Sequence, residues 1–100
     1  MKKLTMTALL VAPLMMAATA QAADPAAGQA KAAVCMACHG ADGVGVGPEW
    51  PNLAGQKELY LAKQMRAFRD GTRSDPLMSA QAAGLSDEDI EDLAAYYSGL

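Results

Sequence analysis

Apolar residues recur along this chain with the period of amphipathic helices, and three helices are expected. The first covers an alanine-rich run from Ala26 to Val34, a composition that favours helix. Asp24 and Pro25 precede it and are the usual residue types of an N-cap and a first helical position. We expect this helix to continue into Cys35 and Cys38, so that both cysteines lie on its last turn.

The second helix is expected from Gln56 to Arg69. Leu61, Met65 and Phe68 recur at i, i+4 and i+7 and give this segment one apolar stripe. Gly71 follows and is a suitable C-terminal stop.

The third helix begins after Ser86, which forms a capping-box pattern with Asp89. Acidic residues fill its first turn, where the helix dipole favours negative charge. Apolar positions then recur at i, i+3, i+4 and i+7, and Gly99 ends the helix. These positions are Ile90, Leu93, Ala94 and Tyr97.

Two loops, residues 40–55 and 72–85, separate the helices, and neither contains a convincing strand. The first loop is rich in glycine and proline, which prevent regular structure. A long irregular loop in a small domain usually has a functional role. The pattern therefore predicts an all-α domain of three main helices, with loops that enclose a bound group.

The N-terminal segment has the composition of a secretory signal peptide. Lys2 and Lys3 precede an apolar run from Ala8 to Ala18, and Ala20-Gln21-Ala22 is a small-x-small cleavage site. The run is shorter than the roughly 20 residues that cross a bilayer, so an uncleaved anchor is the lesser alternative. We expect residues 1–22 to be removed, residues 23–100 to form the domain, and the product to lie in the periplasm without stable membrane insertion.

Removal of Lys2 and Lys3 leaves six basic residues against eleven acidic ones, a formal charge of −5. Such a charge is unfavourable for binding to nucleic acid or acidic lipid. The remaining chain also has few large apolar residues, and a domain this small usually needs a covalent or metal staple.

The strongest chemical signal is Cys35-Met36-Ala37-Cys38-His39, which holds the only cysteines and the only histidine of the chain. This spacing is typical of covalent haem c attachment, and an exported protein is a suitable place for it. Three alternatives are weaker. A thioredoxin-like dithiol needs a βαβ unit, a disulfide here would close a very small loop, and a zinc site usually needs four protein ligands.

Electron-transfer haems often pair the proximal histidine with a methionine. Met36 lies between the cysteines and cannot reach the far side of a ring, and Met65 lies on an apolar helix stripe. Met78 lies in a loop with no periodic reason to be apolar, so it is favoured as the second iron ligand over simple packing.

Three further positions are candidates near the cofactor. The Pro51-Asn52-Leu53 segment can offer the Pro51 carbonyl to the second ring nitrogen of His39, or it can be a plain turn. The Trp50 indole N–H and the Arg73 guanidinium can each reach a haem propionate, or they can be ordinary core and surface residues.

The chain resembles the class I c-type cytochromes, and in particular one domain of the bacterial dihaem cytochromes c of the c-four type, here with one haem motif. The resemblance covers almost all of the chain after residue 22. Its matching stretches are Cys35-Met-Ala-Cys-His-Gly-Ala-Asp-Gly43, Pro51-Asn-Leu-Ala-Gly-Gln56, Tyr60-Leu61, Phe68-Arg-Asp-Gly-Thr-Arg73, Met78, Leu85-Ser-Asp-Glu-Asp-Ile90 and Leu93-Ala-Ala-Tyr-Tyr97.

This resemblance implies thioether bonds from Cys35 and Cys38, and axial bonds from His39 and Met78. It also implies that the Pro51 carbonyl accepts from His39, and that Gly28 and Tyr97 lie where the first and last helices cross. The expected fold is a small class I cytochrome c fold around one covalent haem.

The expected function is that of a periplasmic one-electron carrier of a respiratory chain, not an enzyme. Its partners would be redox proteins such as a membrane oxidase, a reductase or a dehydrogenase, and the chain would be a monomer or weak dimer. The alternatives are a haem-based sensor or peroxidase-like protein with a labile sixth site, a haem-free dithiol-disulfide oxidoreductase, and a dedicated subunit of a larger complex.

Overall fold

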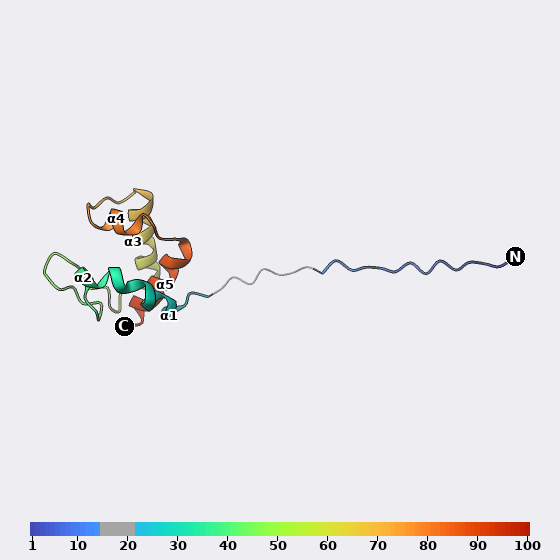
Figure 1. Ribbon diagram of the computed structural model, residues 1–100, viewed down its shortest axis with the longest axis horizontal. Helices are drawn as coiled ribbons and strands as arrows, with labels where there is room; N and C mark the ends of the chain where they lie inside the picture. The colour runs from blue at the N-terminus through green and yellow to red at the C-terminus, as the bar shows by residue number, and fades with distance from the viewer. Residues whose placement is uncertain (15–21) are drawn as a thin grey trace.

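A computed structural model describes residues 1–14 and 22–100, and its helices surround a small core (Figure 1). Within these residues there is no strand, so the predicted all-α class is confirmed. The elements are α1 (Pro25–Lys31), the 3₁₀ turn η1 (Ala32–Val34), α2 (Met36–His39), α3 (Glu58–Asp70), α4 (Met78–Ala82) and α5 (Asp87–Ser98).

The N-terminal segment leads away from the domain (Figure 1). Residues 1–14 form no helix. Part of the predicted apolar run and most of the predicted cleavage site lie outside the described residues. Among the helices of the described part, none combines the length and apolar character that a membrane span requires.

The predicted first helix is present but is divided into three short pieces. Asp24 caps it as expected, and its carboxylate accepts from the Ala26 N–H at 3.0 Å. The α-helical turns of α1 end at Lys31, η1 follows, and α2 starts again after Cys35. The cysteines therefore do not lie on the last turn of one continuous helix, and a separate helical turn holds them.

The second helix starts two residues later than predicted and ends at its predicted stop. Gly71 closes α3 with a φ of 87°, a left-handed conformation that glycine adopts without strain. Leu61 and Phe68 are buried, and Met65 is half-buried and packs against the core. The apolar stripe is thus the face with which α3 covers the domain.

The predicted second loop contains a short helix that the sequence pattern did not lead us to expect. The carboxylate of Asp75 accepts from the Leu77 and Met78 N–H groups, both at 2.9 Å, and so caps the turn that leads into α4, whose N-cap position is Leu77. Ala82, which is fully buried, anchors the other end of this helix. The signal was the Asp75-Pro76 pair, the same residue types that correctly indicated the start of α1.

The last helix agrees with its prediction in detail. Ser86 Oγ accepts from the Asp89 N–H and Asp89 Oδ2 accepts from the Ser86 N–H, both at 3.0 Å, which completes the capping box. Its four predicted apolar positions are all buried, and Gly99 is the C-cap.

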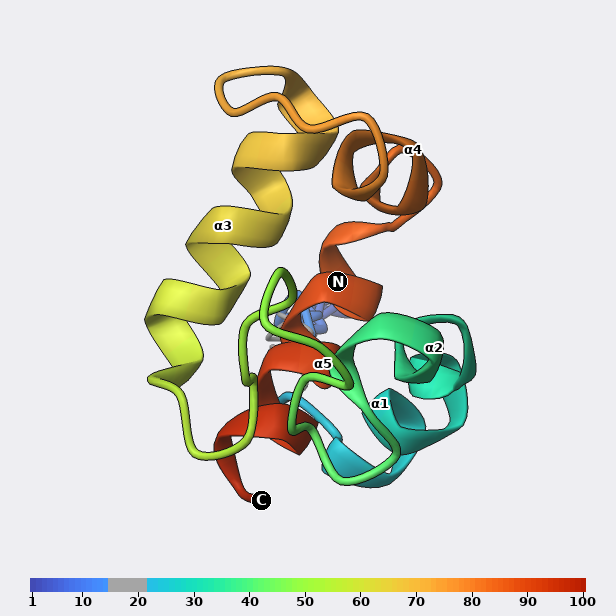
Figure 2. The ribbon, with the colours of Figure 1, turned by 90° about the vertical axis from the view of Figure 1, so that its left-hand side faces the viewer.

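Helix α5 lies between α3 and the α1–α2 segment (Figure 2). A Cβ atom on Gly28 of α1 would lie 2.0 Å from the Asp92 carbonyl oxygen and 2.9 Å from the Tyr96 Cβ. Gly28 therefore permits a close crossing of α1 and α5. The nearest neighbours of Gly28 at this crossing belong to Asp92 and Tyr96, and Tyr97, which was also expected near the crossing, is buried in the core cluster.

A buried carboxylate also fastens α1 to α5. Asp92, 3% exposed, accepts from the Asp24 N–H at 2.8 Å and from Lys31 Nζ at 3.0 Å. Lys31 Nζ lies 2.8 Å from Asp89 Oδ1 as well. These bonds, chiefly the backbone donor of Asp24, hold the pKa of the Asp92 carboxyl below its usual range. We call Lys31, Asp89 and Asp92 the α1–α5 clamp.

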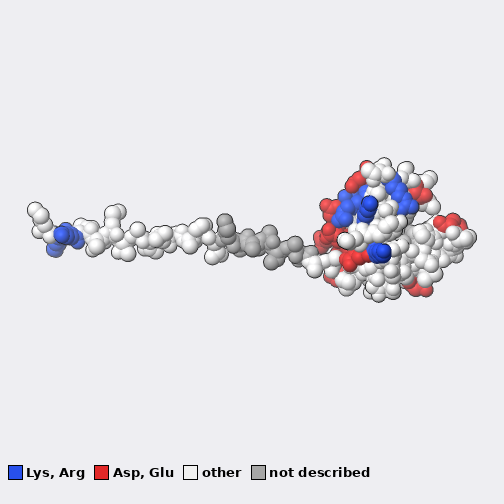
Figure 3. Space-filling model, turned by 180° about the vertical axis from the view of Figure 1, so that it is seen from behind, with Lys and Arg blue, Asp and Glu red and all other residues white. Residues whose placement is uncertain are grey.

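Ion pairs join α3 to α5 on the surface, where basic and acidic side chains lie side by side (Figure 3). Arg69 Nη1 lies 2.8 Å from Asp87 Oδ1, and Arg66 Nη2 lies 3.1 Å from Glu91 Oε1. Exposed pairs of this kind contribute about 0–1 kcal/mol each, so burial of the apolar stripes remains the main stabilising contribution.

Candidate functional site

The Cys35–His39 segment forms a single helical turn. The His39 N–H donates to the Cys35 carbonyl at 2.9 Å, and the Gly40 N–H donates to the Met36 carbonyl at 3.0 Å. Residues at i, i+3 and i+4 share one face of a helix, so this turn places Cys35, Cys38 and His39 together. Gly40 then leaves the helix with a φ of 82°.

Cys35 and Cys38 form no disulfide, and both are half-buried. Burial raises the pKa of the Cys35 thiol, while the nearby Tyr97 hydroxyl acts in the opposite direction. Cys35 packs against the core.

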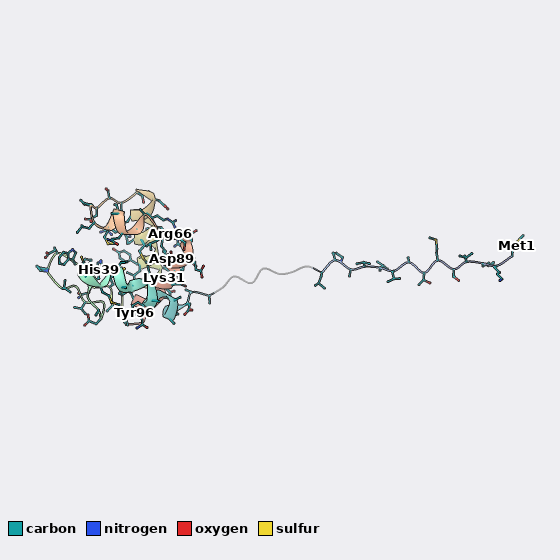
Figure 4. The ribbon with its side chains drawn as sticks, in the orientation of Figure 1. Met1, Lys31, His39, Arg66, Asp89 and Tyr96 are labelled. Atoms are coloured by element: carbon teal, nitrogen blue, oxygen red, sulfur yellow. The ribbon has the colours of Figure 1, made fainter. Side chains whose placement is uncertain are left out.

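His39 lies at the end of α2 (Figure 4), and the loop that follows holds its ring in one orientation. The residue is 7% exposed, and Nδ1 lies 2.8 Å from the Pro51 carbonyl oxygen. A carbonyl can only accept, so Nδ1 carries the proton and Nε2 keeps a free lone pair. The structure therefore contains the Pro51 contact that the sequence predicted, and it leaves Nε2 able to bind a metal ion.

Backbone hydrogen bonds fix the position of Pro51. The Gly43 carbonyl accepts from the Leu53 and Ala54 N–H groups at 2.7 and 3.0 Å. The Val46 N–H donates to the Cys38 carbonyl at 3.0 Å. Residues 43–54 thus form a folded loop that is bonded directly to the cysteine turn.

The same loop is attached to α5. The Gly55 N–H donates to the Tyr97 carbonyl at 2.9 Å, and Leu53 packs against the core as a half-buried residue. Trp50 is half-buried, and its backbone N–H donates to the Gly47 carbonyl at 3.2 Å. The loop therefore has one end on the cysteine turn and the other on the last helix.

Met78 is the first residue of α4 and is half-buried. Met36 and Met65 pack against the hydrophobic core, whereas Met78 is not among the described residues that do so. Packing therefore accounts for the other two methionines and leaves the side chain of Met78 without a role in the core.

Arg73 lies three residues after the end of α3. Its Nη1 donates to Gln64 Oε1 at 2.8 Å, and its guanidinium carbon lies 4.4 Å from the centre of the Phe68 ring. Arg73 is exposed, and both the hydrogen bond and the cation–π contact are with neutral side chains.

These residues fit an iron porphyrin better than a bare metal ion. The described residues contain no group of three or more His, Cys, Asp or Glu side chains that could hold a metal ion. One imidazole with a free Nε2, next to two thiols on one helical turn, suits a metal that arrives with most of its ligands in its own ring. The geometry defines a c-type haem protein of the all-α class.

The comparisons with known proteins agree with this class. The family model described as cytochrome c matches residues 25–100. The chain belongs to the cytochrome c family.

Two relatives show how far the similarity extends. Cytochrome c-554(548) of Halomonas halodenitrificans is 54% identical over 80 residues, which cover 77% of this chain and 96% of the relative. Cytochrome c4 of Pseudomonas aeruginosa is 52% identical over 98 residues, which cover 98% of this chain and 48% of the relative. The chain thus spans about half the length of that cytochrome c4.

A solved structure supports the fold. Reduced recombinant cytochrome c4 from Pseudomonas stutzeri superposes with a TM-score of 0.73 at 45% identity, over 77% of this chain and 45% of the other. The expected class I cytochrome c fold is therefore confirmed. As a c-type cytochrome, the protein is an electron carrier with a covalently bound haem c, and Cys35 and Cys38 are the cysteines of its attachment motif.

Proposed function

We propose that this protein is a periplasmic one-haem electron carrier in which His39 and Met78 would supply the two protein ligands of the haem iron. The bound haem supplies a one-electron couple, and the chain provides its ligands and surroundings. The observation that carries the proposal is the 2.8 Å contact between His39 Nδ1 and the Pro51 carbonyl. This bond fixes the tautomer and directs Nε2 away from the loop, as second-sphere partners of metal-bound histidines do.

The position of Met78 supports its role as the second ligand. Asp75 caps α4 at Met78 and so holds the backbone of this residue in a defined place. The core does not use its side chain. A thioether ligand is typical of haems that transfer electrons and leaves no open position for oxygen.

Trp50 and Arg73 belong to the proposal as residues that face the propionates. For Arg73 this means that the guanidinium exchanges the neutral Gln64 oxygen for a carboxylate, a stronger charge-assisted partner. For Trp50 it means that the indole N–H of a half-buried ring donates to a propionate oxygen.

Export to the periplasm is proposed from the N-terminal sequence. Lys2 and Lys3, the apolar run and Ala20-Gln21-Ala22 have the order of a signal peptide of residues 1–22. Asp24, two residues after the proposed cleavage site, is already bonded to Asp92. The mass of protein recovered from the periplasm tests this directly, because cleavage before Ala23 with one haem attached gives a single expected mass.

Redox proteins are the proposed partners, and the chain is proposed to act as a monomer or weak dimer. One relative, from Thiomonas intermedia, is named a thiosulfate dehydrogenase electron acceptor and is 46% identical over 92% of this chain and 43% of its own. A dehydrogenase that delivers single electrons is therefore a suitable donor class. A charge of −5 on residues 23–100 favours partners with a positive docking surface.

Met78→Ala, with Met65→Leu as the matched control, tests the ligand assignment. In the ferric wild type and in Met65→Leu we expect the long-wavelength methionine-to-iron charge-transfer band. In Met78→Ala the band should vanish, and the reduced protein should bind carbon monoxide rapidly. Loss of the band in Met65→Leu alone, or rapid carbon monoxide binding by the wild type, would overturn the assignment and favour a sensor or peroxidase-like protein.

A further inference from the structure

Tyr97 carries a buried hydroxyl that has no hydrogen-bond partner among the described residues. The residue is 3% exposed and belongs to the core. Buried hydroxyls are nearly always paired, because burial without a partner removes the water that would otherwise bind them. A partner for this hydroxyl is therefore expected in the protein that carries its haem.

The polar group beside Tyr97 is the Cys35 sulfur. Burial, followed by the proximity of Cys35, raises the pKa of the Tyr97 hydroxyl. Cys35 itself packs against the core cluster that contains Tyr97. The two side chains are therefore close to one another, and the Tyr97 hydroxyl makes no hydrogen bond with a described residue.

Haem attachment changes what this sulfur can do. A thiol is both a weak donor and a weak acceptor, whereas a thioether has no proton and can only accept. Between the Tyr97 hydroxyl and an attached Cys35, one arrangement remains, in which the hydroxyl donates. The donor lies on α5, and its backbone is held in place because the Tyr97 carbonyl accepts from the Gly55 N–H.

We propose that Tyr97 donates a hydrogen bond to the thioether sulfur of Cys35 and thereby raises the reduction potential of the haem. The inference rests on the proposed function. A donor on the sulfur withdraws electron density from the ring to which the sulfur is bonded. The reduced haem holds one more electron and gains more from this withdrawal, as with other hydrogen bonds that tune haem and iron–sulfur potentials.

Tyr97→Phe removes only the hydroxyl, and Tyr96→Phe is a matched control on the neighbouring ring, whose centroid lies 5.0 Å away. The measurement is the midpoint potential of each haem-loaded full chain by spectroelectrochemistry. We expect Tyr97→Phe to lower the reduction equilibrium constant about threefold, roughly 30 mV for a one-electron couple, and Tyr96→Phe to leave it unchanged.

Resonance Raman spectra give a second readout that a purely structural role would not move. A C–S stretching band of the wild type should shift on exchange into deuterated water, and in Tyr97→Phe this sensitivity should disappear. Unchanged potential together with unchanged isotope sensitivity would overturn the proposal, and the hydroxyl would then be an unpaired group whose removal only stabilises the fold.

If the Tyr97→Phe protein does not accumulate, a fluorinated tyrosine at position 97 provides an alternative test. The chain has three tyrosines, so a Tyr60→Phe, Tyr96→Phe background leaves Tyr97 as the sole tyrosine. A 3-fluorotyrosine there is nearly the same size and a stronger donor, and it should raise the potential. An unchanged or lower potential would contradict the proposal. Absence of covalent haem from the wild type would instead defeat the proposed function, so the two failures are distinguishable.

Discussion

Gly28 shows how one residue without a side chain determines a helix crossing. The place that a Cβ atom would take on this residue is already filled, by the Asp92 carbonyl oxygen at 2.0 Å and the Tyr96 Cβ at 2.9 Å. Neither atom can move without a shift of α5, because one belongs to its backbone and the other is bonded directly to it. The sequence could indicate that a small residue belongs here, but it could not identify both neighbours.

We predict that Gly28→Ala destabilises the domain by about 1–3 kcal/mol, the usual cost of overpacking a well-packed contact. Gly84→Ala is the control, because a Cβ there meets nothing within 4 Å. Urea unfolding of both haem-loaded variants measures the difference. Equal stability of Gly28→Ala and the wild type would show that α1 and α5 do not cross this closely.

His39 is the residue whose surroundings could best be predicted from the sequence. A cysteine pair next to a histidine indicated the cofactor, and a proline twelve residues later suggested a carbonyl for its ring. Tyr97 is the opposite case. Its apolar spacing predicted burial, but its place beside Cys35, 62 residues away, depends on how α5 lies against the cysteine turn.

At the scale of elements, helix α4 connects a cap to a proposed iron ligand. Asp75 accepts from the Leu77 and Met78 N–H groups, and its own N–H donates to Ser79 Oγ at 3.0 Å. The bonds that its carboxylate accepts, chiefly the one from Met78, hold the pKa of the Asp75 carboxyl below its usual range. The protein's own hydrogen bonds therefore hold the backbone of Met78 in place without a bond to iron.

We predict that Asp75→Ala costs about 1 kcal/mol of stability, the usual value for a capping side chain lost near a helix start, and weakens the bond from Met78 to iron. Titration of the ferric protein with imidazole measures this weakening, because imidazole competes for the methionine position. Displacement of half of the methionine ligand should need less imidazole in Asp75→Ala than in the wild type. Gln81→Ala, an exposed change on the same helix, should need the wild-type amount. Identical titrations of all three proteins would count against the link between cap and ligand.

The α1–α5 clamp should make stability depend on acidity. The pKa of the Asp92 carboxyl is lowered in the folded chain, first by the Asp24 N–H and then by Lys31. A lowered folded pKa contributes stability above the unfolded pKa, about 3.9 for aspartate, and this contribution is lost as pH falls through the folded value.

Asp92→Asn should therefore be less stable than the wild type at neutral pH and should approach it as pH falls from about 5 toward 2. Urea midpoints over this range provide the measurement. Parallel profiles for the two proteins, separated by a constant difference, would show that the Asp92 charge makes no contribution.

Local signals explain which elements the sequence could predict. Caps and apolar periods identified α1, α3 and α5, since these depend on residues within a few positions of one another. The break at η1 and the clamp through Lys31 and Asp92 depend on tertiary contacts, and no short-range pattern reports them. Helix α4 is different, because its Asp-Pro start was readable but lay in a segment interpreted as loop.

At the scale of the whole molecule, two segments distant in sequence meet at the cysteine turn. The loop of residues 43–54 contacts it through Val46, and α5 brings Tyr97 close to Cys35. The fold thus brings residues from most of the domain to one small region. This arrangement explains how a chain with few large apolar residues can fold around a covalently attached haem.

A potentiometric titration of the exported protein, followed in the visible spectrum, is the sharpest test of the proposed His39 and Met78 electron-transfer site. We predict one transition with the slope of a single electron, the reduced spectrum of haem c, and a ferric methionine-to-iron band that disappears in step with reduction. A preparation without covalent haem, or a ferric haem that lacks this band at neutral pH, would contradict the proposal.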